Sequence, residues 1–352
     1  MKGLKAAAVF ALVLILAVSM LVGCSGTKEP VESSAPAASS APAADESAIA
    51  ESPAGEEAAP AEDGVSLYFL LKTLSNPHWV AMKEGIEKAA AEAGVTVYVD
   101  AMNSEDELTG QVDKLMTAVN GDYDGIGIAP ISPTNAIEGV VAANKKGIPV
   151  VNLDEKIEAD ELKNAGGYLV GFATTDNKAV GAKGAGYIIE KLGEAGGQVA
   201  IIEGKAGAAS GEARRDGAKE AFAANSAIEL VASQPADWDR NKALDVATNI
   251  ISQYPEIKAF YCANDTMALG VQEAVENANL KDKCIVVGTD GIPDAITSVD
   301  EGKLAATVAQ DPAEIGRVCF DMLLKAVKDG NPGSLDAEPA FQYVDSVLIT
   351  KE

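Results

Sequence analysis

The sequence contains a single histidine, His78, and only 5% aromatic residues, with two tryptophans in 352 residues. One histidine excludes zinc sites of the HExxH type and His-rich metal centres, and any Ser-His-Asp or Cys-His arrangement would have to use it. Basic side chains are also scarce: 28 stand against 53 acidic ones, which gives a net charge of −25. Such a chain lacks the basic face that binding to nucleic acid requires.

The charge divides the chain into three regions. Residues 1–23 carry two lysines and no acid, residues 25–63 carry nine acids and one lysine, and residues 64–352 carry the remaining net charge of −19. With 47% hydrophobic residues the chain can form folded cores. Its length predicts about two domains of ordinary size.

The N-terminal region has the pattern of an export signal. Lys2 and Lys5 precede an apolar run that begins at Ala6 and ends in the tetrad Leu21-Val22-Gly23-Cys24. The tetrad resembles the bacterial lipobox, which implies a lipoprotein signal peptide over 1–23, lipidation of Cys24 and anchoring at the outer face of the cytoplasmic membrane. An uncleaved transmembrane anchor is the alternative. Both interpretations place the rest of the chain outside the cytoplasm.

Residues 24–64 are expected to form a disordered tether behind the lipidated cysteine. The segment is rich in alanine, serine, proline and glutamate and has no aromatic residue. It cannot bury enough apolar surface to offset its chain entropy, and repeated proline and like charge keep it extended. Its predicted role is to let the folded part of the chain extend away from the membrane anchor.

Three further cysteines, Cys262, Cys284 and Cys319, form no CxxC pair. Two of them lie in apolar, strand-like runs, so we expect small buried side chains; a disulfide or a reactive thiol is the alternative.

From Val65 onward the pattern alternates between strands and helices. Strands are expected over 65–71, 95–101, 125–129, 148–153, 168–174, 198–202, 228–233, 257–262, 284–289, 304–309 and 342–349. Helices are expected from the cap at Ser75-Asn76-Pro77 to Gly94 and over 105–120, 134–146, 177–192, 212–224, 240–252, 265–277, 292–301 and 312–328. This alternation predicts an α/β protein with parallel sheets covered on both faces, two sheets at this length.

Ligands of open α/β sheets bind beyond the carboxyl ends of the strands. Polar residues and both tryptophans follow nearly every expected strand, which predicts one site. They are Lys72, Asn76, Trp79, Asp154, Arg214, Arg215, Trp238, Asn264, Asp265, Asp290 and Gln310. Carboxylates, amides and arginine can each bond adjacent hydroxyls, and tryptophan faces cover apolar C–H patches, which favours a neutral polyhydroxylated ring. For Asn264, Asp265 or Asp290 alone, a helix cap or surface loop is the alternative.

Other chemistries fit the sequence poorly. Residues 181–186 read GxxGxG, which is not the dinucleotide fingerprint and falls inside an expected helix. Asp237 and Asp239 could be imagined as an acid–base pair, but near a helix start they fit a cap and a first-turn charge better. No nucleophile with a base and no calcium loop is found. We therefore expect no catalytic residue, no metal and no cofactor.

Seven segments in order resemble the ribose-type sugar-binding proteins of bacterial ABC importers. They read "LKTLSNPHW", "VVNLDEK", "EGKAGAASGEARR", "SQPADWDR", "CANDTMALG", "VVGTDGIPDA" and "ATVAQDP". The resemblance implies a two-lobed periplasmic-binding-protein type I fold with a parallel sheet in each lobe and a three-crossover hinge near Thr175, Gln310 and Asp345. One lobe would comprise 65–174 with 311–344, and the other 175–310 with 345–352.

The resemblance also implies roles for individual residues. The hydroxyls and ring oxygen of a monosaccharide, D-allose or a related aldohexose or aldopentose, would be bound by Lys72, Asn76, Asp154, Arg214, Asn264, Asp290 and Gln310. His78, Trp79 and Trp238 would enclose the ring. His78 stands where the family usually has an aromatic residue, and a first-turn surface residue is its alternative interpretation.

The expected function is delivery of the sugar to an ABC permease by a monomeric, exported lipoprotein. A sugar-sensing receptor subunit for a chemoreceptor or sensor kinase is the alternative that the sequence leaves open. An exported sugar-modifying enzyme fits less well. A sugar-responsive repressor is disfavoured because residues 25–63 offer no helix-turn-helix.

Overall fold

The computed structural model describes residues 64–351. The predictions of a signal peptide, a lipidated Cys24 and a tether therefore concern residues that lie outside the described part, apart from Gly64 at its edge. Among the described residues, no helix has the length and apolar character needed to cross a membrane.

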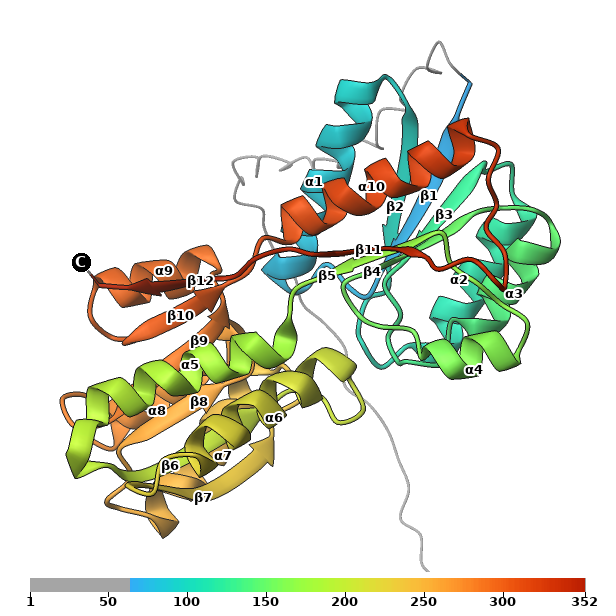
Figure 1. Cartoon of the computed structure of the whole chain (residues 1–352). Helices are drawn as coiled ribbons and strands as arrows, with labels where there is room; N and C mark the ends of the chain where they lie inside the picture. Colours follow the sequence, from blue (N-terminus) through green and yellow to red (C-terminus); the bar gives the residue numbers. More distant parts are fainter. Residues whose placement is uncertain (1–63, 352) are drawn as a thin grey trace, which may run out of the picture. The chain divides into compact units, whose positions relative to one another are not determined.

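The first sheet contains six parallel strands in the order β11-β5-β4-β3-β1-β2. Its strands are β1 (Ser66–Leu71), β2 (Thr96–Ala101), β3 (Gly125–Ile128), β4 (Val150–Leu153), β5 (Gly171–Thr174) and β11 (Ala340–Tyr343). The helices that pack with it are α1 (Pro77–Ala93), α2 (Leu108–Asn120), α3 (Ile137–Lys145), α4 (Ala159–Asn164) and α10 (Pro312–Lys328). α1 and α10 run beside each other on one face, as Figure 1 shows.

The second sheet has the order β12-β10-β9-β8-β6-β7, and only its β10–β12 pair is antiparallel. Its strands are β6 (Gly197–Glu203), β7 (Ile228–Pro235), β8 (Ala259–Cys262), β9 (Ile285–Asp290), β10 (Ala306–Ala309) and β12 (Val347–Thr350). The accompanying helices are α5 (Asn177–Leu192), η1 (Gly193–Ala195), α6 (Ala209–Ala223), α7 (Arg240–Gln253), α8 (Asp265–Asn277) and α9 (Pro293–Asp300).

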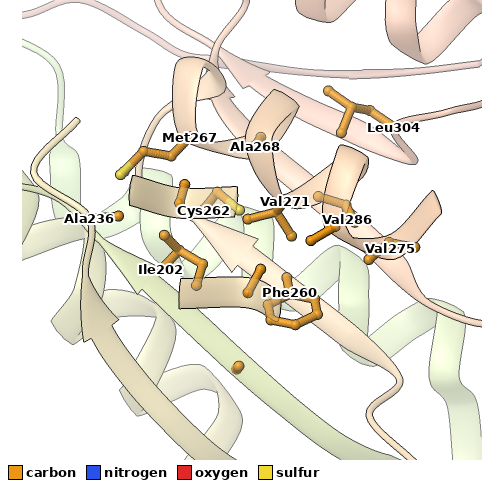
Figure 2. Packing of buried hydrophobic residues seen from close by; sticks show 14 of the residues in the cluster. Ile202, Ala236, Phe260, Cys262, Met267, Ala268, Val271, Val275, Val286 and Leu304 are labelled. Carbon is orange, nitrogen blue, oxygen red and sulfur yellow. The ribbon is translucent and has the colours of Figure 1, made fainter. Parts of the chain in front are cut away.

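Each sheet is covered by apolar side chains on both faces. In the second sheet, Phe260 and Cys262 of β8 pack with Met267 and Val271 of α8 in one cluster (Figure 2). A separate cluster on the opposite face contains Tyr261 of the same strand. This alternation along one strand requires an apolar residue at every position, which is why β8 reads as a continuous apolar run.

The predicted α/β class with two mainly parallel sheets is confirmed. α5, α8 and α10 have the predicted bounds. The prediction of one final strand over 342–349 is wrong: residues 344–346 separate β11, which joins the first sheet, from β12, which joins the second. Periodicity could not reveal this break because each strand contributes only four residues. α4 and η1 were not predicted, and α2 begins at Leu108, later than the expected 105.

The chain passes from one sheet to the other at three places. β5 leads into α5, β10 leads into α10, and β11 leads into β12. In Figure 1 these connections lie together between the two sheets.

Cys262, Cys284 and Cys319 are buried and unpaired. Their predicted role as small buried side chains is confirmed. Burial raises the pKa of the Cys284 thiol to about 12 and that of Cys262 well above its ordinary value, so neither is a ready nucleophile.

Candidate functional site

A polar cavity lies at the carboxyl ends of strands from both sheets. Its lining residues are Lys72, Asn76, His78, Trp79, Glu105, Asp154, Glu155, Ser210, Arg214, Trp238, Asn264 and Asp290. The structure thus brings together nine of the ten side chains assigned to the site by resemblance. Gln310 is not part of the lining but touches it, because its Nε2 donates to Oδ1 of Asp290 at 2.6 Å.

The start of α1 supplies two aromatic rings to the cavity. Oδ1 of Asn76 accepts a hydrogen bond from the backbone N–H of His78 at 3.0 Å and caps the helix, and Pro77 occupies the first helical position. His78 and Trp79 follow in the first turn, both buried, with ring centroids 5.1 Å apart and an interplanar angle of 82°. The interpretation of His78 as a surface residue is wrong, because it is 5% exposed.

His78 lies between two carboxylates that follow strands of different sheets. Its Nε2 is 3.3 Å from Oδ2 of Asp154, which follows β4, and its Nδ1 is 4.0 Å from Oδ1 of Asp290 at the end of β9. Burial lowers the pKa of His78, but Asp154 and Asp290 more than offset this, so its pKa lies above the ordinary value. Burial raises the pKa of Asp154, but His78, Arg214 and Lys72 hold it below its usual range. Both members of the pair are therefore charged in mildly acidic solution.

Lys72 forms a second charged group with two glutamates. Its Nζ is 2.8 Å from Oε2 of Glu105 and 3.5 Å from Oε2 of Glu155. Burial lowers the pKa of Lys72, but Glu155 and Glu105 outweigh it and keep the pKa above its usual value. Nζ also lies 5.6 Å from the centroid of the Trp79 ring, within cation–π range.

Arg214 on α6 is fixed by partners from several elements. Its Nε donates to Oδ1 of Asn177 and its Nη1 to the carbonyl of Ala263, both at 2.8 Å, while Nη1 lies 3.3 Å from Oδ1 of Asp290. Burial raises the pKa of Asp290, and Arg214 and His78 offset this only in part. A guanidinium held by this many acceptors is preorganised, so little of its conformational freedom remains to be lost on ligand binding. Arg215 points elsewhere and pairs with Glu203 and Asp216.

Trp238 forms the aromatic wall contributed by the second sheet. The ring fits because Gly204 and Gly211 carry no side chain: an added Cβ would come within 2.0 Å and 2.8 Å of it, respectively. The guanidinium carbon of Arg214 lies 6.0 Å from the ring centroid. Asp239 caps α7 through the N–H of Lys242, as its position predicted, rather than acting as an acid or base beside Trp238.

Three of the lining residues have positive φ angles. They are Asp154 at 55°, Trp238 at 66° and Asp290 at 123°. Non-glycine residues in this region carry backbone strain of about 1–3 kcal/mol each, and such strain concentrates where side chains must be aimed at a ligand. Each of these residues follows or ends a strand, so the strained backbone turns the side chain into the cavity.

Several buried polar atoms of the site have no hydrogen-bond partner among the described residues. They are Nδ1 of His78, Oδ1 of Asp154, Nε1 of Trp238, Nδ2 of Asn264 and Oε1 of Gln310. Leaving such atoms unpaired in a buried site costs about 1–3 kcal/mol each. Both donors and acceptors occur in the set, which matches a ligand whose groups donate and accept at the same time.

Glu105, Glu155 and Ser210 line the cavity but were not predicted to do so. Glu155 directly follows Asp154 at the exit of β4, and Ser210 lies in the glycine- and alanine-rich segment before Arg214, so the strand-exit rule could have found both. Glu105 gave no such signal, because it was assigned to a helix that in fact begins three residues later.

The periplasmic binding protein domain model matches residues 67–332 of the chain. The chain is 57% identical over 282 residues to the D-allose-binding periplasmic protein of Escherichia coli (strain K12), covering 80% of this chain and 91% of that protein. It is 36% identical over 269 residues to the ribose import binding protein of Bacillus subtilis (strain 168), covering 75% and 83%.

Solved structures with the same fold include sugar complexes. A periplasmic solute-binding protein of an ABC transporter from Actinobacillus succinogenes 130z, with bound D-allose, aligns with a TM-score of 0.76 at 34% identity, covering 82% of this chain and 98% of that one. A solute-binding protein from Agrobacterium vitis with bound D-fucose aligns with a TM-score of 0.74 at 28% identity, covering 81% and 95%.

Proposed function

The chain belongs to the periplasmic binding protein family, and we propose that it captures a monosaccharide outside the cytoplasm and delivers it to the membrane permease of an ABC importer. D-allose or a related aldohexose or aldopentose is the proposed ligand. The observation that carries this proposal is the set of unpaired buried donors and acceptors in and beside a cavity that both tryptophans line.

The proposal assigns complementary roles to these groups. A hydroxyl donates one hydrogen bond and accepts others, so Oδ1 of Asp154 would accept from it while Nδ2 of Asn264 and Nε1 of Trp238 would donate to it. The rings of Trp79 and Trp238 would cover the C–H faces of the sugar. A sugar lacking one of the bonded hydroxyls would leave a buried partner unpaired, which gives selectivity of about 1–3 kcal/mol per group.

Capture would require the site to rearrange. The cavity has a volume of about 30 Å³, which is room for a few water molecules and not for a sugar ring. A sugar ring would therefore enter an opened site and replace part of the contacts that the charged side chains make with one another. We propose that 65–174 with 311–344 and 175–310 with 345–352 are the two lobes that open and close, with the three crossovers as the hinge. Ligand contacts to both lobes would shift the population toward the closed form.

Binding without turnover is part of the proposal. The carboxylates of the cavity are held by fixed cations: Asp154 pairs with His78, Asp290 with Arg214, and Glu155 with Lys72. Ser210 donates its Oγ hydrogen bond to Glu155, but this carboxylate also accepts from the Ser210 backbone N–H and lies 3.5 Å from Nζ of Lys72, which makes it a poor base for a nucleophile. Incubation with D-allose followed by mass spectrometry should return the sugar unchanged.

Lipidation at Cys24 would hold this monomeric receptor at the outer face of the cytoplasmic membrane. Two acyl chains anchor a protein stably, whereas one is marginal. Wild type should incorporate labelled palmitate and sediment with membranes, and Cys24→Ser should be released in soluble form. Equal membrane association of the two would favour the uncleaved anchor instead.

Titration of tryptophan fluorescence with a panel of aldoses tests the proposed function, because both tryptophans line the cavity. D-allose, D-ribose, D-galactose and D-xylose form the panel, with mannitol as an acyclic control. We expect a saturable change with at least one aldose. No response to any of them, confirmed by calorimetry, would overturn the proposed function.

A further inference from the structure

Helix α6 begins without a cap of its own. Its N-cap residue is Ala208, whose side chain has no acceptor and makes no capping hydrogen bond to the first turn. The first N–H groups of a helix need such partners, and replacing a capping side chain by alanine costs about 1 kcal/mol. Acceptors for these groups come from water or from elsewhere in the fold.

Glu155 supplies the acceptor from the other sheet. Its Oε1 accepts a hydrogen bond from the backbone N–H of Ser210 at 2.9 Å, and its Oε2 accepts one from Oγ of Ser210 at 2.8 Å. Glu155 follows β4 of the first sheet, whereas α6 packs with β6 and β7 of the second. The carboxylate is 1% exposed and faces the positive end of the helix dipole, where a negative charge is favoured.

This contact fixes the helix that carries Arg214. Ser210 and Arg214 are four residues apart on α6 and therefore share one helix face. Lys72, 3.5 Å from Oε2, keeps the carboxylate charge compensated on the side of the first sheet. Holding the first turn of α6 against Glu155 thus sets where the guanidinium of Arg214 meets the cavity.

Lys205 makes another polar contact between the same regions, which is of a different kind. Lys205 bonds the backbone carbonyl of Glu105 at 2.6 Å and the carboxylate of Asp106, but Asp106 is 85% exposed. Solvent-exposed pairs contribute little because water and salt screen them. The buried bonds of Glu155 are therefore the stronger connection.

We propose that Glu155 is a positioning residue that latches the two lobes by capping α6 across the cleft. The latch joins the two lobes in the arrangement that the structure shows, and it lengthens the life of that closed form. The effect on sugar binding rests on the proposed function, whereas the cap itself is a property of the protein without sugar.

Two measurements test the latch. Glu155→Ala should raise the dissociation rate of the sugar about 10- to 100-fold with a smaller change in the association rate, because two hydrogen bonds to a charged group are lost after closure. The amides of Ser210 and Gly211 should exchange hydrogen faster than in wild type, with and without sugar. Ser210→Ala keeps the backbone N–H but removes Oγ, so it should have an intermediate effect on the dissociation rate and on the amide exchange. Glu155→Gln replaces Glu155→Ala in both measurements if the alanine variant does not fold.

Glu220→Gln is the matched control, because Glu220 is an exposed acid near the other end of the same helix, where it pairs with the exposed Lys178. It should leave both measurements at wild-type values. Unchanged dissociation and unchanged exchange in Glu155→Ala would overturn the latch. If wild type binds no sugar, the proposed function fails, and the exchange of the Ser210 amide in sugar-free protein still decides the latch.

Discussion

Substitution of Asp154 by asparagine separates the binding role of this carboxylate from its role in stability. Asp154 is 5% exposed, its Oδ2 faces His78 at 3.3 Å and its Oδ1 has no partner among the described residues. Alanine is a poor choice here, because the backbone of residue 154 has a φ of 55° and an alanine in the left-handed region costs about 1–2 kcal/mol by itself. Asparagine tolerates this conformation and keeps the size of the side chain.

The expected loss of affinity follows from one charge-assisted hydrogen bond. Such a bond contributes about 1.5–3 kcal/mol, so the Kd for the preferred aldose should rise about 10- to 150-fold. Titration calorimetry at pH 6 measures this change. Asp237→Asn is the matched control: residue 237 also has a positive φ, of 53°, but its carboxylate is exposed and pairs with Lys242. The control should leave Kd unchanged.

Stability should respond in a pH-dependent way. The low pKa of Asp154 in the folded protein gives stability that is present above its unfolded value and lost in acid. The high pKa of His78 gives stability that is present below its unfolded value of 6.5 and lost as the pH rises through the folded value. Asp154→Asn should therefore lower Tm most at about pH 5–6.5 and less at alkaline pH. A Kd within twofold of wild type, or a Tm difference independent of pH, would refute the reasoning.

Three other predictions concern single side chains. His78→Phe should flatten the decline of Tm as the pH rises above 6.5, because the raised pKa of His78 makes wild type lose the His78 contribution on that side; equal slopes in both proteins would contradict this. Gly204→Ala should raise Kd about 5- to 10-fold, since a Cβ would lie 2.0 Å from the Trp238 ring, whereas Gly186→Ala, with no atom within 4 Å, should not. Cys284 should resist iodoacetamide in native protein and react after unfolding, as peptide mass spectrometry can show; rapid native labelling would contradict its burial.

From the sequence, the residues that line the cavity could be predicted, but the contacts that these residues make with one another could not. Strand exits can be located from hydrophobic runs, and parallel topology brings them to one edge, so Lys72, Asp154 and Asp290 were found without any knowledge of distances. The partner of each charge could not be found in this way. His78 and Asp154 are 76 positions apart, and Glu155 and Ser210 are 55 apart, and no periodic pattern encodes such pairs.

The helix caps show a second limit of the sequence argument, which treated a cap and a site residue as alternatives. Asn264 is both: its Oδ1 accepts from the N–H of Met267 to cap α8, and its Nδ2 stays unpaired and lines the cavity. Asn76 caps α1 through Oδ1 and lines the same cavity. An amide can do this because it has two ends of opposite character: fixing the acceptor on the helix leaves the donor directed away from it. At the start of a helix that follows a strand, capping thus aims the amide at the strand exit, so the cap is the means by which Asn264 becomes available to a ligand.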